Sequence, residues 1–168
     1  MVALFEPVFD ALEAAGVRYV VVGGVAVVLH GYARFTSDLD IAVDLSPEAA
    51  TQAMEALVGL GLRPRLPVEV AGFADPVVRA RWIDERNMTV FSLWDPEDPL
   101  RSVDVFVENP IDFEELWEGS ELVELSGTRT RIASIADLIR LKRIAARPQD
   151  HADIDALEAI DAVREGDR

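Results

Sequence analysis

The sequence contains no cysteine, which excludes disulfide bonds and metal sites built from thiolates. It also has no apolar run that approaches the roughly 18–20 residues a membrane-spanning helix needs. Lysine is nearly absent, because Lys142 is the single lysine among 16 basic residues. The first residues lack the basic region and apolar core of a signal peptide, so we expect a cytoplasmic protein with no membrane partner.

Positive charge is scarce throughout the chain. The 168 residues include 31 acidic and 16 basic side chains, which gives a formal net charge of −15. Proteins that bind nucleic acid by neutralising many phosphates carry the opposite excess, so nucleic acid is the less favoured partner. Half of the residues are hydrophobic, enough for a sizeable core. We expect a single domain over 1–168, with a core over 1–133 and a helical tail over 134–168.

Hydrophobic periodicity and turn residues predict a mixture of helices and strands. The expected helices cover 3–15, 25–30, 47–60, 134–147 and 150–164, and the expected strands cover 17–22, 39–43, 66–70, 77–83, 88–93, 102–107 and 128–132. The stretch 108–124 is strongly acidic and is expected to be a solvated surface segment. This pattern favours an α/β (α+β) fold, in which helices flank a mixed β-sheet and a helical extension follows at the C-terminus.

Three aspartates lie on predicted strands or directly beside one. Asp38 and Asp40 are two residues apart, so alternation along the strand places both carboxylates on one face. Asp104 interrupts an otherwise apolar strand, where an unpaired carboxylate is costly. One interpretation is a strand with a polar face; the other is a divalent metal site, since Mg²⁺ prefers hard oxygen ligands. In the second interpretation Asp104 is also a candidate general base.

The Gly23–Gly24 pair joins a buried strand to a short helix. Either it simply allows a tight turn with positive φ, or it brings phosphates to the N-terminal N–H groups of the helix. Arg34, Thr36 and Ser37 directly precede the Asp38–Asp40 pair and are candidates for contacting a triphosphate or the carboxylates. For each of these three residues a plain surface turn is the competing interpretation.

The predicted helix 134–147 places Lys142 in the middle of its apolar stripe. An inward lysine either pairs with a buried aspartate or contacts a phosphate in a cleft. Asp153 falls on the apolar side of the next helix, so we expect it to bond Lys142 or an arginine. Arg140, Arg143 and Arg147 share another face and are expected to form a solvated basic strip that pairs with the acidic surface.

Taken together, these residues resemble the motif of the nucleotidyltransferase superfamily, which has the DNA polymerase β-like fold. The motif is a Gly-Gly or Gly-Ser turn, an Asp-x-Asp pair some ten residues later and a third carboxylate on a neighbouring strand. Gly23–Gly24, Asp38-Leu39-Asp40 and Asp104 match it. The tail from Asp137 to Asp153 looks like that of AbiEii-type members, and the chain also resembles lincosamide nucleotidyltransferases. Val25 departs from the pattern, because many members have a phosphate-binding serine there.

The resemblance implies Mg²⁺ (or Mn²⁺) held by Asp38, Asp40 and Asp104, with an NTP as substrate. It implies transfer of a nucleoside monophosphate to a hydroxyl of a protein or small molecule. A toxin neutralised by an antitoxin-like protein partner is one role that fits, and drug modification is another. The alternative is a catalytically degenerate nucleotide-binding or protein-interaction domain.

Overall fold

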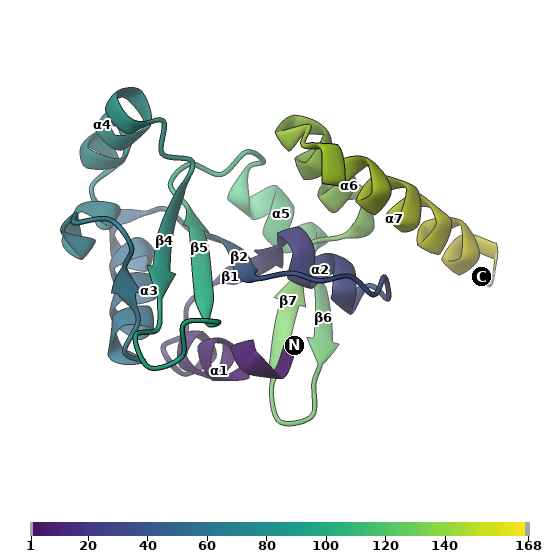
Figure 1. The fold of residues 1–168 in the computed structure, drawn as a ribbon, viewed down its shortest axis with the longest axis horizontal. Coiled ribbons are helices and arrows are strands. Elements are labelled where there is room, and N and C mark those ends of the chain that lie inside the picture. The colour runs from purple at the N-terminus through teal and green to yellow at the C-terminus, as the bar shows by residue number, and fades with distance from the viewer. Residues whose placement is uncertain (1, 167–168) are drawn as a thin grey trace.

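The computed structural model describes residues 2–166. A mixed sheet of seven strands runs in the order β3-β4-β5-β2-β1-β7-β6 (Figure 1). Strand β1 pairs antiparallel with β2 and parallel with β7, and β2 pairs parallel with β5. The pairs β3–β4, β4–β5 and β6–β7 are antiparallel. The predicted α/β architecture with a mixed sheet is therefore confirmed.

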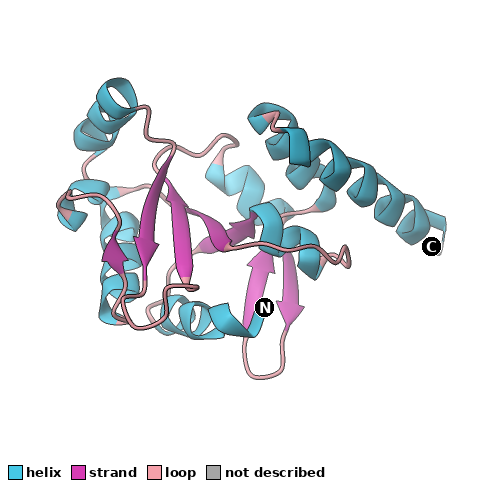
Figure 2. Ribbon diagram, viewed as in Figure 1, coloured by secondary structure: helices cyan, strands magenta, loops and turns pink. Residues whose placement is uncertain are grey.

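The helices and strands alternate along most of the chain (Figure 2). The strands are β1 (Tyr19–Val22), β2 (Asp38–Val43), β3 (Arg63–Pro64), β4 (Val90–Trp94), β5 (Ser102–Phe106), β6 (Glu121–Glu124) and β7 (Arg129–Ile132). The α-helices are α1 (Glu6–Ala14), α2 (Gly23–Leu29), α3 (Pro47–Gly59), α4 (Pro76–Arg86), α5 (Phe113–Gly119), α6 (Ile135–Ala145) and α7 (Pro148–Gly166), with 3₁₀ turns η1 (Val2–Phe5) and η2 (Val70–Ala74).

The two faces of the sheet differ in what they bury. One face carries fully buried apolar side chains of the central strands, including Leu39, Ile41, Val103 and Val105. Helices α1 and α3 pack together beside it, and Phe9 of α1 stacks on Tyr19 with ring centroids 6.4 Å apart. Because side chains alternate along a strand, the opposite face carries Asp38, Asp40 and Asp104, which are only half-buried, and we call it the open face.

The prediction of strands over 66–70 and 77–83 is wrong. Residues 70–74 form the 3₁₀ turn η2 and residues 76–86 form helix α4. The carboxylate of Asp75 caps α4 by accepting hydrogen bonds from the N–H groups of Val77 and Val78 at 2.8 and 3.4 Å. Pro76 occupies the first helical position, where its missing N–H is not needed. The pair Asp75–Pro76 is thus a helix start, not a turn between strands.

The acidic stretch 108–124 is more ordered than its charge suggests. Asp112 caps helix α5 through the N–H groups of Glu114 and Glu115. Within the stretch Ile111, Phe113 and Leu116 are buried in the core, and β6 follows directly. The acidic side chains face water while these apolar residues anchor the segment, so the expectation of a purely solvated segment is wrong.

The C-terminal hairpin of α6 and α7 forms as predicted. The two helices contact each other, α6 also contacts α2, and α7 extends away from the sheet toward the C-terminus (Figure 1). Within residues 2–166 we find no helix with the length and apolar character needed to span a bilayer.

Candidate active site

The three predicted aspartates lie side by side on the open face of the sheet. In the parallel pair of β2 and β5, Asp40 is the register partner of Asp104, and Asp38 is the partner of Ser102. Residues in register on adjacent strands project from the same face. Asp38, Asp40 and Asp104 are each half-buried. The fold thus brings together carboxylates that are more than sixty residues apart in the sequence.

The Gly23–Gly24 turn closes over these carboxylates. Gly23 has φ +61, and a Cβ added there would lie 2.0 Å from Oδ2 of Asp40. A Cβ on Gly24 would lie 2.5 Å from Oγ1 of Thr36. A residue without a side chain is needed at Gly23 for the turn to approach this carboxylate so closely, and its positive φ also favours glycine. Because the two glycines have no side chains, Asp40 of β2 and Thr36 of the preceding loop can pack against this turn.

The electrostatics of the aspartates are those of crowded carboxylates. Burial raises the pKa of Asp40 from 3.8 to about 7; the charges of Asp104 and Asp38 add to this, while Arg147 and the N–H of Gly24 oppose it. Burial also raises the pKa of Asp104, reinforced by Asp38 and opposed by a hydrogen bond from Ser92 and the charge of Arg65. Neutralising one of these carboxylates, by a proton or by a cation, stabilises the group.

A cleft of about 490 Å³ opens on Asp40 and Asp104. Gly23 and the cations Lys142 and Arg147 also line it. Its remaining walls are mainly apolar and come from the end of β1, the region around β4 and β5, the loop after β5, and α6: Val22, Thr89, Val90, Phe106, Pro110, Leu138, Leu141, Ile144 and Ala145. Asp38 lines a separate cavity of about 280 Å³ together with Thr36, Ser37 and Arg65. The carboxylates thus line two cavities, of which the larger has the volume of a small-molecule site.

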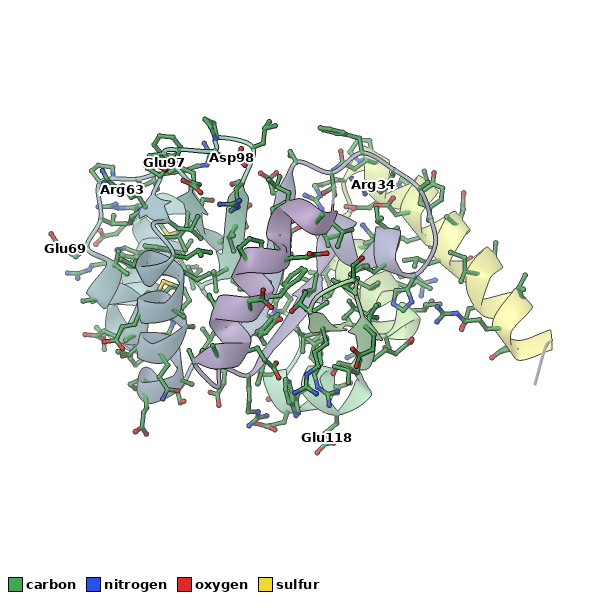
Figure 3. All side chains as sticks on the ribbon, turned by 90° about the horizontal axis from the view of Figure 1, so that it is seen from below. Arg34, Arg63, Glu69, Glu97, Asp98 and Glu118 are labelled. Carbon is green, nitrogen blue, oxygen red and sulfur yellow. The ribbon has the colours of Figure 1, made fainter. Side chains whose placement is uncertain are left out.

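The side chains of Arg34, Thr36 and Ser37, in the loop before β2, have different partners. Ser37 donates a hydrogen bond to Oδ2 of Asp38 at 2.6 Å, and Thr36 donates to the backbone carbonyl of Asp38 at 3.3 Å. Arg34 instead forms an ion pair with Asp153 of α7, and Figure 3 shows it beside that helix. Ser37 and Thr36 therefore organise the start of β2, and Arg34 ties the loop to the tail.

Lys142 is buried with only 4% of its surface exposed. Its Nζ donates to Asp153 at 2.5 Å and to Asp150 at 3.3 Å, so of the two predicted environments the ion pair with buried aspartate is the one observed. The inward orientation of Asp153 and its bonds to Lys142 and to an arginine are as predicted. Lys142 also lines the cleft that contains Asp40, and its contact with a phosphate stays a prediction.

Two cationic residues near the aspartates were not predicted as site residues. Arg147 was expected in a solvated basic strip, and Arg140 and Arg143 do pair with Glu115 and Glu158 at 2.5 and 3.1 Å. Arg147 instead lines the cleft. The sequence pattern that could have indicated this position is Arg147-Pro148-x-Asp150. It is typical of a helix start in which the carboxylate of Asp150 accepts hydrogen bonds from the preceding Arg147. Arg65, whose charge lowers the pKa of Asp104, carries no comparable signal in the sequence.

The aspartates fit a divalent cation by their chemistry. Hard oxygen ligands from three adjacent carboxylates are what Mg²⁺ or Mn²⁺ prefers, and the elevated pKa of Asp40 reflects a charge that such a cation would offset. Within residues 2–166, however, no three His, Cys, Asp or Glu side chains are already gathered in the arrangement of a metal site. Binding would require the three carboxylates to turn toward one ion.

No model of a known protein family matches the chain, and no curated protein is similar to it in sequence. Solved structures do match. The lincosamide antibiotic adenylyltransferase LnuA, bound to lincomycin, aligns over 95% of this chain and 98% of its own, with 16% identity and a TM-score of 0.64. ANT(2")-Ia in complex with adenylyl-2"-tobramycin aligns over 98% and 95%, with 15% identity and a TM-score of 0.58.

A third similar structure is an antigenic nucleotidyltransferase-like protein from Paracoccidioides brasiliensis. It aligns over 92% of this chain and 73% of its own, with 14% identity and a TM-score of 0.56. All of these similarities span nearly the whole chain at low sequence identity. The chain therefore has the fold of the antibiotic nucleotidyltransferases.

Proposed function

We propose that the protein is a nucleotidyltransferase that moves a nucleoside monophosphate from an NTP to a hydroxyl group of a small molecule. The observation that carries the proposal is the register of Asp40 with Asp104, with Asp38 on the same face and the Gly23–Gly24 turn against Asp40. This arrangement occurs at a cleft, in a fold shared with LnuA and ANT(2")-Ia.

In the proposed reaction the acceptor oxygen attacks the α-phosphorus of the NTP. A new phosphorus–oxygen bond forms to the acceptor, the bond between the α-phosphorus and its bridging oxygen breaks, and pyrophosphate leaves. Asp104 would accept the hydroxyl proton as general base, and burial, which raises the pKa of its carboxyl, supports this role. Positioning of the two reactants would supply most of the rate enhancement.

Asp38, Asp40 and Asp104 would hold the divalent cation, Mg²⁺ or Mn²⁺. When bound, the cation offsets the negative charge of the phosphates and of the pyrophosphate that leaves. The protein would contribute the three carboxylates from two hydrogen-bonded strands, β2 and β5. Gly23 keeps the space above Asp40 free of a side chain.

A small-molecule acceptor is favoured by the size of the cleft and by the fold neighbours. A cavity of about 490 Å³ lies within the roughly 300–1,000 Å³ typical of small-ligand sites. The neighbours are described as bound to lincomycin and to adenylyl-2"-tobramycin. A protein acceptor, an AbiEii-like subgroup and an antitoxin-like partner are further hypotheses, for which the tail motif from Asp137 to Asp153 is the sole support.

The proposal is tested by thermal-shift titration with each NTP, with and without Mg²⁺. We expect one NTP to stabilise the wild type in a metal-dependent way, and the Asp38→Ala/Asp40→Ala double variant to lose this effect. Asp10→Ala, an exposed aspartate on α1, is the matched control and should respond like the wild type. The NTP so identified is then used in a pyrophosphate-release assay with a panel of hydroxylated small molecules.

Each outcome of these assays decides a different point. Pyrophosphate release that depends on one acceptor and on Asp104 supports the transferase. Binding of NTP with no release on any acceptor, including a candidate protein substrate, supports a degenerate nucleotide-binding domain instead. No response to any NTP at millimolar concentration contradicts both and leaves a protein-interaction domain.

A further inference from the structure

The elbow between α6 and α7 places Arg147 at the cleft. Helix α6 ends at Ala145, and Ala146 adopts the left-handed conformation with φ 49. This turns the chain before α7 begins at Pro148. Arg147 therefore extends from a bend and not from the face of a helix. It lines the same cleft as Gly23, Asp40 and Asp104.

Asp150 fixes the orientation of Arg147. Asp150 is only 1% exposed, and its carboxylate accepts a hydrogen bond from the backbone N–H of Arg147 at 2.9 Å. The same carboxylate accepts from Nε at 3.1 Å and from Nη2 at 3.4 Å of the Arg147 side chain. A two-point contact of this kind holds the plane of a guanidinium. Nη1 makes no hydrogen bond to any residue in the described span 2–166.

The charges around the elbow leave Arg147 as the accessible cation. Three cations, Arg34, Lys142 and Arg147, share two buried carboxylates, Asp150 and Asp153. The side chains of Lys142 and Arg34 are 4% and 21% exposed, whereas that of Arg147 is 58% exposed. In a chain of net charge −15, this is a local positive group at the edge of a cleft lined by aspartates.

We propose that Arg147 binds the phosphate chain of the donor NTP and that Asp150 is the residue that positions it. The inference rests on the proposed nucleotidyl transfer and adds a residue to its site. The reacting phosphorus has to approach Asp40 and Asp104, and Arg147 lines the same cleft. A pre-oriented guanidinium matches the geometry of phosphate oxygens and loses little rotational freedom on binding.

The test is calorimetric titration, in the presence of Mg²⁺, of the NTP that the wild type binds most tightly and of inorganic tripolyphosphate. Arg147→Gln should weaken both affinities by roughly 10- to 100-fold, the range expected for loss of a hydrogen bond to a charged group. Arg147→Lys should lie between this variant and the wild type. Arg143→Gln, which removes an exposed arginine of α6 paired with Glu158, should stay within about twofold.

The positioning role of Asp150 is tested by a double-mutant cycle. Asp150→Asn should weaken NTP binding in the wild-type background but add no further loss to Arg147→Gln. A merely structural role would lower the melting temperature equally in both backgrounds and would leave affinity additive, which would overturn the positioning role.

The outcomes separate this inference from the proposed function. If the wild type binds an NTP and Arg147→Gln binds it within twofold, Arg147 is not a phosphate ligand and the proposed function stands. If Arg147→Gln loses NTP affinity but keeps tripolyphosphate affinity, Arg147 contacts another part of the nucleotide and the inference is wrong. If the folded wild type binds no NTP, the proposed function fails and this inference fails with it.

Discussion

Asp40 is the residue at which the requirements of folding and of the proposed chemistry conflict. Its carboxylate lies against Gly23, beside Asp104, with a pKa raised to about 7 chiefly by burial. In the unfolded chain the same group ionises near 3.8. The folded state is therefore stabilised by the neutral form and loses that advantage as the pH rises from about 4 through 7. A loss of folding stability of this kind is expected where an ionised carboxylate is retained to bind a cation.

Asp40→Asn should increase the stability of the protein at alkaline pH. Asparagine has nearly the same shape and no charge, so the gain should grow between pH 4 and 7 and level off above 7. Its size should be on the order of 2–4 kcal/mol, from about 1.4 kcal/mol per unit of pKa difference. Urea unfolding at pH 5 and pH 8 measures it. A gain equal at both pH values would show that ionisation of Asp40 is not its cause.

Gly23→Ala should abolish the close approach between the turn and Asp40. The added Cβ would lie 2.0 Å from Oδ2 of Asp40, at a φ of +61. Gly16→Ala is the matched control, because Gly16 has φ +68 and nothing within 4 Å of an added Cβ. Left-handed strain should cost both variants about 1–2 kcal/mol. Only Gly23→Ala should also lose the metal-dependent thermal shift with NTP; an equal loss in Gly16→Ala would refute the specific role.

The sequence predicted which carboxylates share a face of the sheet better than it predicted side-chain contacts. Alternation places Asp38 and Asp40 on one face, and the structure agrees. The pairing of Asp40 with Asp104 depends on the register between β2 and β5. That register cannot be read from the spacing of residues in the sequence, so the resemblance alone suggested that these two carboxylates lie together. The partner of Arg34 is likewise a matter of tertiary packing, because Asp153 lies 119 residues further along.

At the scale of elements, the α6–α7 hairpin is joined to the rest of the site by buried charges. Asp153 is 2% exposed and accepts from Lys142 of α6 and Arg34 of the loop before β2. Three segments therefore meet at one carboxylate. A buried ion pair adds little by itself, but removal of one partner leaves the other charge buried without compensation.

Asp153→Ala should destabilise the protein by roughly 3–5 kcal/mol, because Lys142 and Arg34 lose their shared carboxylate in a buried environment. Asp155→Ala, at an exposed position on the same helix, should change the free energy of unfolding by no more than about 0.5 kcal/mol. Chemical denaturation measures both. A loss below about 1 kcal/mol for Asp153→Ala would mean that Asp150 alone satisfies Lys142.

Elements with one dominant signal were predictable, and elements with competing signals were not. Strand β2 and helix α3 follow from uninterrupted periodicity, and the predicted hairpin over 88–107 appears as β4 and β5. In 76–86, β-branched residues suggested a strand, but the Asp75 cap and Trp82 packed over Gly72 favour the helix. Within 108–124, acidic residues concealed the apolar anchors of α5, whose burial depends on the distant sheet.

At the scale of the whole molecule, acidic charge outweighs the pairs that offset it. Exposed arginines such as Arg18 and Arg129 pair with Glu114 and Glu13 at 2.5 and 2.6 Å, but 31 acidic residues remain against 16 basic ones. The net charge of −15 therefore acts as self-repulsion across the folded surface. The aspartates of the candidate site, on the open face of the sheet, are part of this excess.

Added salt should consequently stabilise the whole protein at neutral pH. Raising NaCl from about 10 to about 150 mM shortens the screening length from about 30 to about 8 Å, which weakens repulsion across the surface. We expect the melting temperature to rise by about 2–4 °C, or roughly 1 kcal/mol for a chain of this size. At a pH near the sequence pI of 4.4 the net charge vanishes, so the same salt step should have little effect. A decrease of melting temperature with salt at pH 7.5 would show that the surface ion pairs contribute more stability than the excess negative charge removes.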